Sequence, residues 1–541
     1  MIFGRLKTTK RAFSKIEHIF GKENIEVLNG KSFKLKNFVR GEWVEAKNYE
    51  PMINPLNGSI MYESPLTDTE KEIQSFVDDM KLCSKSGMHN PFKNPQKYRE
   101  WGETCQRLVG ALNDPEIHNH LFKSIQITIP KSDVEVNGEL LLTKRFMENF
   151  SGDNPRLSYR GFTVAGDHEG QMSTGYRFPF GPVSIIGPFN VPFKIPLQQL
   201  IGAVITGNKV LLKADSRCSL SVYNFLHLMQ YCGADMSYVS MISCQGPVME
   251  KLLTREDSPI RNTQFTGSSH IGDKLAGSLK GKVRLEDSGF NWKILGPDVS
   301  DVDYVAYQAD QDSYAHAGQK CSATSILFCH TNWKDSGFIQ KLKKLAEQRK
   351  LANLTNCPIF TWTDSKLQAH IDSILSLPGT KILFGGEADK ERGSIPSSFG
   401  FYKPTAIYVP LDQLLNAMNY DLITTEIFGP YLLVTDYDEK NLDSIFDFMN
   451  NLKFHLTASV VSNDVRFINH IVKNTVNGLT TTGMRGRTTG SPQNHWFGPS
   501  NDPRGTGCGS REGVLQTWTC HREVVNDYGA YQEECKSGLQ T

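Results

Sequence analysis

The chain has 541 residues, of which 39% are hydrophobic and 22% are charged, and 59 basic side chains nearly balance 58 acidic ones. This length exceeds what one hydrophobic core usually holds, so we expect two or three domains. The balanced charge offers no basic surface for a nucleic acid, and no apolar stretch reaches the ~20 residues that a membrane span requires. The 11 cysteines include no C-x-x-C pair, which favours a reducing compartment and predicts neither a disulfide framework nor a metal site.

The N-terminal segment, residues 1–16, carries five basic side chains and no acidic one, with apolar residues between them. This composition is typical of a mitochondrial targeting sequence, which would place the protein in the mitochondrial matrix. A solvated N-terminal segment of a cytoplasmic protein explains the same residues. The sequence leaves both locations open.

The first third of the chain combines short hairpins with helices. Residues 38–66 alternate and turn as hairpins do, and helical periodicity follows over residues 69–123, with a break near 89–95. A further hairpin is predicted for residues 160–180. An exposed hairpin often makes subunit contacts, although an edge hairpin without a partner fits the pattern equally well.

From residue 183 onwards, short apolar runs alternate with helical segments. This rhythm predicts an α/β fold with a doubly wound parallel sheet, whose ligands bind at the carboxyl ends of the strands. A second α/β segment follows the first. Helices are expected after residue 190 and at 220–230, 248–253 and 268–279. The expected strands are 183–186, 209–213, 239–243, 262–265 and 283–286, and then 325–328, 381–384, 405–409, 431–435 and 456–461.

Residues 481–510 form a long segment without periodicity, containing seven glycines and three prolines around Trp496 and Phe497. A long loop inside a compact domain is uncommon unless it serves a function. We therefore interpret this segment as a functional loop, and an irregular connection is the alternative.

Polar side chains follow several of the expected strands. Asn190 offers a neutral amide donor of the kind that an oxyanion site requires, and Lys213 could donate to ribose hydroxyls. Gly267 and Ser268 open a helix, where backbone N–H groups favour a pyrophosphate. A turn asparagine, a solvated lysine and a simple helix cap explain the same residues, and the chain has no G-x-G-x-x-G fingerprint.

Two further residue types complete this set. Glu286 and Asp287 end a strand, and because strand side chains alternate, at most one of them is expected to face a given site. A carboxylate beside a thiol can act as a general base. Cys321 follows a Gly-Gln-Lys turn, where its thiol could attack a substrate carbonyl, although a buried structural cysteine is the ordinary alternative.

The order and spacing of these stretches resemble the NAD(P)-dependent aldehyde dehydrogenase superfamily. Within it, the closest resemblance is to the plant-type dehydrogenases of pyrroline-carboxylate, or glutamate γ-semialdehyde. Residues 143–150, 292–299 and 488–499 carry this closer resemblance. The superfamily motifs are Pro-Phe-Asn-x-Pro at 188–192, Gly-Asn-x-Val-x-x-Lys at 207–213, Phe-Thr-Gly-Ser at 265–268, Leu-Glu-x-x-Gly at 285–289, Gly-Gln-x-Cys at 318–321 and Glu-Ile-Phe-Gly-Pro at 426–430.

The resemblance implies a role for each motif residue. Cys321 would be the nucleophile and Glu286 the general base, while Asn190 and the Cys321 backbone N–H would hold the oxyanion. NAD would be the cofactor, with Phe428 near its nicotinamide, Lys213 and Glu426 at its ribose hydroxyls and Ser268 at its pyrophosphate. The remaining cofactor-site residues of the motifs are Pro188, Phe189 and Gly267.

The implied substrate is a small molecule, glutamate γ-semialdehyde, which would be oxidised in proline breakdown. Ser322 and the stretch Gly505-Thr506-Gly507 resemble the family's anchor for the substrate carboxylate, and Phe497 fits the same loop. Another semialdehyde dehydrogenase, transfer of the acyl group to coenzyme A and a catalytically silent homologue with a binding role stay as alternatives. The retained Glu286 argues against coenzyme A transfer, and the intact catalytic set argues against silence.

Three positions depart from the family pattern. Gln199 replaces a lysine that contacts the oxyanion asparagine in most members, so a proton relay there is in doubt. Ser216 replaces a glutamate that disfavours a 2′-phosphate, so the sequence leaves the preference between NAD and NADP open. His316 could lower the pKa of the thiol, or it could be a packed neutral side chain.

The resemblance also implies a domain division. Residues 1–159 and 180–287 would form the NAD-binding domain, and residues 288–509 the catalytic domain. Residues 160–179 and 510–541 would be oligomerisation elements of a homo-oligomer, with the hairpin as its arm.

Overall fold

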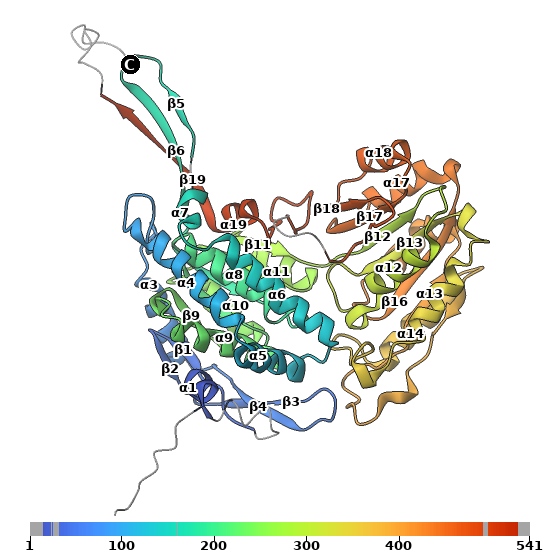
Figure 1. The fold of residues 1–541 in the computed structure, drawn as a ribbon, viewed down its shortest axis with the longest axis horizontal. Coiled ribbons are helices and arrows are strands. Elements are labelled where there is room, and N and C mark those ends of the chain that lie inside the picture. The colour runs from blue at the N-terminus through green and yellow to red at the C-terminus, as the bar shows by residue number, and fades with distance from the viewer. Residues whose placement is uncertain (1–13, 23, 25–31, 160, 491–495, 529–541) are drawn as a thin grey trace, which may run out of the picture.

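The computed structural model describes residues 14–22, 24, 32–159, 161–490 and 496–528, and two seven-stranded sheets form its two lobes (Figure 1). The sheets lie side by side along the long axis of the molecule, and a three-stranded arm projects from one lobe. Most of the basic N-terminal segment, residues 1–13, and the end of the chain, residues 529–541, lie outside the described residues.

The first sheet has the order β11-β10-β7-β8-β9-β1-β2, and β7 to β11 run parallel. The chain passes from β7 to β8 and β9 on one side and returns to β10 and β11 on the other. Such a reversal of strand order opens a crevice at the carboxyl ends of the two strands that flank it, here β7 and β10. The strands are β1 (Asn37–Val39), β2 (Glu42–Val44), β7 (Pro182–Ile186), β8 (Lys209–Lys213), β9 (Val239–Met241), β10 (Asn262–Thr266) and β11 (Val283–Glu286).

Helices cover both faces of this sheet, and α8 (Lys194–Ile205) is the most deeply buried of those beside the crevice. All its residues from Ile195 to Ile205 are buried, and most of them are apolar, as expected for a helix inside the core. The other helices of this lobe are α1 (Lys15–Phe20), α3 (Glu70–Lys81), α4 (Gln96–Leu112), α5 (Pro115–Thr128), α6 (Asp133–Asn149), α7 (Asn154–Ser158), α9 (Ser219–Tyr231), α10 (Gly246–Thr254) and α11 (Ser269–Ser278).

The second sheet has the order β14-β15-β16-β13-β12-β17-β18, and all strands except β14 run parallel. Its helices include α12 (Val302–Tyr314), α13 (Phe338–Ala346), α14 (Asp364–Leu375), α15 (Leu411–Leu414), α16 (Tyr420–Ile423), α17 (Leu442–Asn450) and α18 (Val465–Lys473). The strands are β12 (Asn291–Leu295), β13 (Thr324–His330), β14 (Lys381–Phe384), β15 (Thr405–Tyr408), β16 (Tyr431–Tyr437), β17 (Thr457–Val461) and β18 (Leu479–Thr482).

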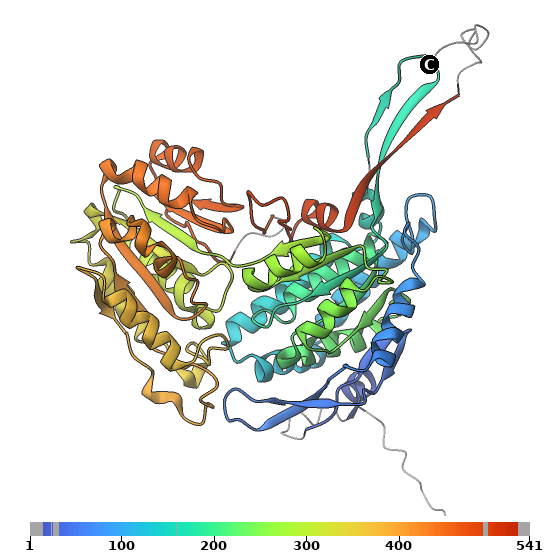
Figure 2. The same ribbon diagram turned by 180° about the vertical axis from the view of Figure 1, so that it is seen from behind.

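The projecting arm joins two distant parts of the chain (Figures 1 and 2). Its three strands are β5 (Thr163–Ala165), β6 (Gln171–Pro179) and β19 (Thr519–Asp527), and β6 pairs antiparallel with both others. Helix α19 (Arg511–Trp518) leads into β19 from the first lobe. The predicted hairpin is therefore present, and the C-terminal segment adds a third strand to it.

The strands expected from the sequence are confirmed with shifts of a few residues at their ends, and so is the break between α3 and α4. The hairpins β1–β2 and β3 (Tyr49–Ile53) with β4 (Ile60–Pro65) are also confirmed. Two strands were not expected from the sequence: β12, which is fully buried, and β18 at the sheet edge. None of the described helices is long and apolar enough to cross a membrane.

Candidate active site

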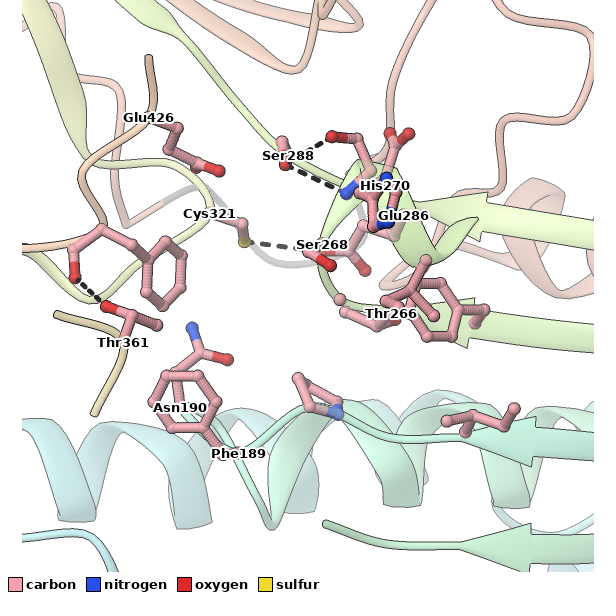
Figure 3. A pocket seen from close by; sticks show the side chains of 18 of the residues that line it. Phe189, Asn190, Thr266, Ser268, His270, Glu286, Ser288, Cys321, Thr361 and Glu426 are labelled. Carbon is pink, nitrogen blue, oxygen red and sulfur yellow. Dashed lines mark hydrogen bonds between the residues drawn. The ribbon is translucent and has the colours of Figure 1, made fainter. Parts of the chain in front are cut away.

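A cavity of about 1090 Å³ lies between the two lobes (Figure 3). The first sheet lines it with residues that follow its strands, among them Asn190 after β7, Lys213 at the end of β8 and Ser268 after β10. These residues lie at the carboxyl ends of parallel strands, where the sequence analysis expected the ligand crevice. Pro188, Phe189 and Gly267 also line the cavity.

The second sheet lines the same cavity with residues that precede its strands. Cys321 lies before β13, and Glu426 and Phe428 lie before β16. One sheet thus presents its carboxyl ends and the other its amino ends to a shared space. Phe428 adopts a left-handed backbone conformation, with φ of 50°, and its ring meets the ring of Phe189 edge-on at 5.8 Å between centroids.

Cys321 and Glu286 both line this cavity and lie close to each other (Figure 3). The Cys321 thiol donates to Glu286 Oε1 at 3.4 Å, while the other carboxyl oxygen has no partner among the described residues. Glu286 is 1% exposed, and burial raises the pKa of its carboxyl to about 7. Burial and the neighbouring Glu286 charge raise the pKa of the Cys321 thiol. The thiol therefore holds its proton, with a carboxyl of near-neutral pKa in position to remove it.

The backbone around Cys321 is held by contacts that the sequence analysis did not identify. Asn291, the first residue of β12, donates from Nδ2 to the carbonyl of Cys321 and to that of Ala323, each at 2.8 Å. Gly289 packs so closely that a Cβ there would lie 2.4 Å from the Cys321 carbonyl oxygen. No local pattern marks Asn291, although Gly289 stands in the Leu-Glu-x-x-Gly motif.

Asn190 is 4% exposed, and its Nδ2 donates to the backbone carbonyl of Gln319 at 2.9 Å. This bond joins the loop after β7 to the turn that carries Cys321. An amide nitrogen has two N–H groups, so a second donor is left for a ligand.

Both acidic residues at the end of β11 line the cavity, so the expectation that at most one of them would face it is wrong. The alternation rule applies within a strand, whereas β11 ends at Glu286 and Asp287 belongs to the following turn. Burial raises the pKa of Asp287 to about 6. Glu426 accepts from the Gly289 N–H at 3.1 Å, and burial raises the pKa of its carboxyl to about 7.

The stretch 505–507 lies against β11 rather than on the wall of the main cavity. The Thr506 N–H donates to the Leu285 carbonyl at 2.9 Å, next to Glu286. The hydroxyl of Thr506 contacts that of Thr517, and Thr506 is 2% exposed. Gly505 forms a bridge with Leu285, and a Cβ at Gly507 would clash with the ring of Trp496.

Two other predicted substrate residues are also placed by the structure. Phe497 pairs through its backbone with Cys508, and Ser322 is 8% exposed. Neither is among the described residues that line the main cavity. The carboxylate anchor therefore stays a prediction, supported by the closeness of the loop to Glu286.

The positions that depart from the family pattern have different surroundings. Gln199 is buried and accepts from Trp518 Nε1 at 3.0 Å. His316 is 3% exposed, and burial holds its pKa well below the usual range, which favours the packed neutral side chain. Next to Ser216, the Arg217 side chain lines the cavity, pairs with Asp215 and lies 4.8 Å from the Phe189 ring centroid.

The cavity suits a dinucleotide in its shape and its donors. The N-terminus of α11 faces it, and Ser268 makes no capping bond with its own side chain, which leaves its hydroxyl available. A Cβ at Gly267 would lie 2.7 Å from the Phe265 ring, so only glycine lets the backbone pass this close to that ring. The Ser288 hydroxyl, which the sequence analysis did not identify, accepts from the Ser269 N–H at 3.2 Å. The described residues contain no group of three potential metal ligands.

The chain was compared with known proteins. The model of the aldehyde dehydrogenase family matches residues 43–519. The mitochondrial delta-1-pyrroline-5-carboxylate dehydrogenase 12A1 of Arabidopsis thaliana is 47% identical over 497 residues, which are 92% of this chain and 89% of that protein. Among solved structures, betaine aldehyde dehydrogenase of Staphylococcus aureus in complex with NAD+ has a TM-score of 0.77 at 18% identity, covering 94% of this chain and 97% of that one. An NADP-dependent glyceraldehyde-3-phosphate dehydrogenase of Bacillus halodurans, complexed with NADP, has a TM-score of 0.75 at 20% identity, covering 92% and 100%.

Proposed function

The chain belongs to the aldehyde dehydrogenase family, and from this premise we propose that it oxidises L-glutamate γ-semialdehyde, which forms by opening of pyrroline-5-carboxylate, to L-glutamate with NAD+. One observation carries the chemistry: Cys321 Sγ lies 3.4 Å from Glu286 Oε1 inside the cavity between the lobes. The 47% identity to the pyrroline-carboxylate enzyme supports the choice of substrate.

Cys321 is the nucleophile in this proposal, and Glu286 is the base that activates it. The ionised Glu286 carboxylate takes the thiol proton, and the thiolate adds to the aldehyde carbon to form a thiohemiacetal. After oxidation, the thioester on Cys321 is hydrolysed by water that Glu286 deprotonates. A carboxyl with a pKa of about 7 is suited to accept and release protons near neutral pH.

Asn190 and the Cys321 backbone N–H hold the negative oxygen that develops on the substrate. Because the Asn190 amide is already oriented by its bond to Gln319, little reorganisation is needed when charge appears. One such donor contributes about 3–4 kcal/mol to transition-state stabilisation.

Residues on both walls of the cavity would hold NAD+. Ser268, Gly267 and the first turn of α11 suit its pyrophosphate, and Lys213 and Glu426 suit its ribose hydroxyls. Phe428, Phe189 and Pro188 provide the apolar surface beside the nicotinamide. When bound there, NAD+ supplies the acceptor for the hydride of the thiohemiacetal carbon.

The substrate carboxylate would bind at Ser322 and the stretch 505–507, with Phe497 in the same loop. The backbone of this stretch pairs with Leu285, so the anchor would lie one residue from the base Glu286. Backbone N–H groups and a hydroxyl are suitable donors to a carboxylate.

The remaining proposals concern assembly and location. Residues 1–159 and 180–287 would form the NAD-binding domain, and residues 288–509 the catalytic domain. The arm would join subunits in a homo-oligomer, because several of its apolar side chains are exposed, among them Phe162 at 58% and Val525 at 60%. The mitochondrial relative and the basic N-terminal segment support a mitochondrial location.

One assay tests the proposed function. NADH formation from pyrroline-5-carboxylate is compared with that from succinic semialdehyde and from an aliphatic aldehyde, for the wild type and Cys321→Ser. We expect the highest kcat/KM with pyrroline-5-carboxylate and none in the variant. Preference for succinic semialdehyde would favour another semialdehyde dehydrogenase, preference for the aliphatic aldehyde would refute the carboxylate anchor, and no turnover of any aldehyde would favour a silent homologue.

A further inference from the structure

A buried ion pair lies directly behind the loop that carries Asn190. Lys131 lies between α5 and α6, and Glu139 lies on α6; Lys131 Nζ and Glu139 Oε2 are 2.5 Å apart. Lys131 is 2% exposed and Glu139 is 4% exposed. Removing two charges from water is costly unless their remaining hydrogen-bonding capacity is used, so their other contacts indicate what the pair does.

Glu139 supplies the N-terminal cap of α8. This helix has no side-chain cap of its own, because Phe193 occupies its N-cap position. Glu139 Oε1 instead accepts from the Phe193 N–H at 2.7 Å and from the Lys194 N–H at 2.9 Å. A carboxylate at a helix N-terminus is electrostatically favourable and satisfies donors that would otherwise be buried without a partner. The carboxylate therefore determines where α8 starts and where the loop before it ends.

Lys131 holds the other part of the same loop. Its Nζ donates to the backbone carbonyl of Asn190 at 3.2 Å, and on the opposite side Asn190 Nδ2 donates to the carbonyl of Gln319. Asn190 is thus held by hydrogen bonds on two sides, from Lys131 in the connection between α5 and α6 and to the turn that carries Cys321. Lys131 is the cation that contacts Asn190, whereas Gln199, at the position of the usual family lysine, is bonded to Trp518.

We propose that Lys131 and Glu139 are positioning residues for the oxyanion donor: together they fix the backbone of residues 190–194, so that the Asn190 amide points to where the substrate oxygen becomes negative. They touch neither substrate nor cofactor, and they act through Asn190. The inference rests on the proposed function, because it assigns to Asn190 the role of oxyanion donor.

A matched pair of variants separates positioning from stability. Lys209 and Asp79 form a second buried ion pair, at 2.9 Å with side chains 3% and 1% exposed, at the start of β8 and therefore away from the cavity. Lys131→Met and Lys209→Met each leave a buried carboxylate without its cation, so both should lower the melting temperature. At a temperature where both are folded, we expect kcat to fall roughly tenfold or more in Lys131→Met, with KM for NAD+ unchanged, and to stay within about twofold in Lys209→Met.

A double-mutant cycle with Asn190→Ala tests whether the pair acts through Asn190. In that background, adding Lys131→Met should lower kcat by less than about twofold, because the positioned amide is already gone. An equal loss in both backgrounds, or a wild-type kcat in Lys131→Met, would overturn the inference. The wild-type reaction is measured first. If the wild type shows no reaction, both the proposed function and the inference are refuted. If the wild type and Lys131→Met both turn over normally, the inference alone is refuted.

Discussion

Glu286→Gln offers the sharpest test of the proposed chemistry, because the exchange keeps the shape of the side chain and removes only its basicity. Glu286 is the buried carboxyl that contacts the Cys321 thiol, and its pKa is raised to about 7. Since the pKa is raised, the carboxyl is protonated at lower pH and the base is lost as pH falls. The ionised fraction is about one tenth at pH 6 and about nine tenths at pH 8.

We therefore expect kcat of the wild type to rise roughly tenfold from pH 6 to pH 8, following this ionisation. Removal of a general base lowers a rate by about 10²–10⁴-fold. In Glu286→Gln we expect a loss of that order and no remaining rise with pH over this range. Initial rates of NADH formation at saturating pyrroline-5-carboxylate, together with the first turnover in a stopped-flow instrument, measure both effects.

Glu426→Gln is the matched control, because Glu426 lines the same cavity and its pKa is also raised to about 7. Its carboxyl is bonded to the Gly289 N–H rather than to the thiol, so we expect a higher KM for NAD+ with the pH dependence retained. A normal kcat in Glu286→Gln, or loss of the pH dependence in Glu426→Gln alone, would refute the assignment of the base.

Two further substitutions test the support around the thiol, and a third tests a buried ion pair of the second lobe. In Gly289→Ala the new Cβ would lie 2.4 Å from the Cys321 carbonyl oxygen. We therefore expect kcat to fall in steady-state kinetics and the stability to fall by about 1–3 kcal/mol in thermal unfolding. An unchanged kcat would contradict this close approach. Asn291→Ala removes the donor to the same carbonyl, and a shift of the thiol by about 1 Å would lower kcat up to ~100-fold; normal rates would show that the bond is dispensable. Lys293→Met leaves the fully buried Asp312 without its ion-pair partner. Urea unfolding should then show a free energy of unfolding lower by about 3–5 kcal/mol, and an unshifted unfolding midpoint would contradict this prediction.

Much of the candidate site could be predicted from local sequence. Asn190, Lys213 and Ser268 follow strands that could be located by their apolar runs, and parallel strands with helical crossovers place such residues at one edge of a sheet. Roles for Glu286 and Cys321 could be proposed because their motifs occur in the family's order. The structure brings this set together around one cavity.

The contacts that hold these site residues in place could not be predicted from local sequence. Lys131 and Glu139 precede Asn190 by 59 and 51 residues and stand in an ordinary helical region, so nothing local distinguishes them from surface charges. Asn291 starts a strand that has no continuous apolar run to mark it, since β12 is buried but carries the polar side chains of Asn291 and Lys293. Burial and hydrogen bonding between distant segments determine these roles.

The sequence by itself determined the two α/β rhythms, because most strands covered by helices on both faces are short apolar runs that stand out locally. It also determined the order of the chemical groups, since the motifs are local. Only the tertiary structure decided that the carboxyl ends of one sheet face the amino ends of the other, which brings Glu286 to 3.4 Å from Cys321. Burial at that junction then raises the carboxyl pKa to about 7, a property that no stretch of sequence contains, because it arises from the removal of water by both lobes.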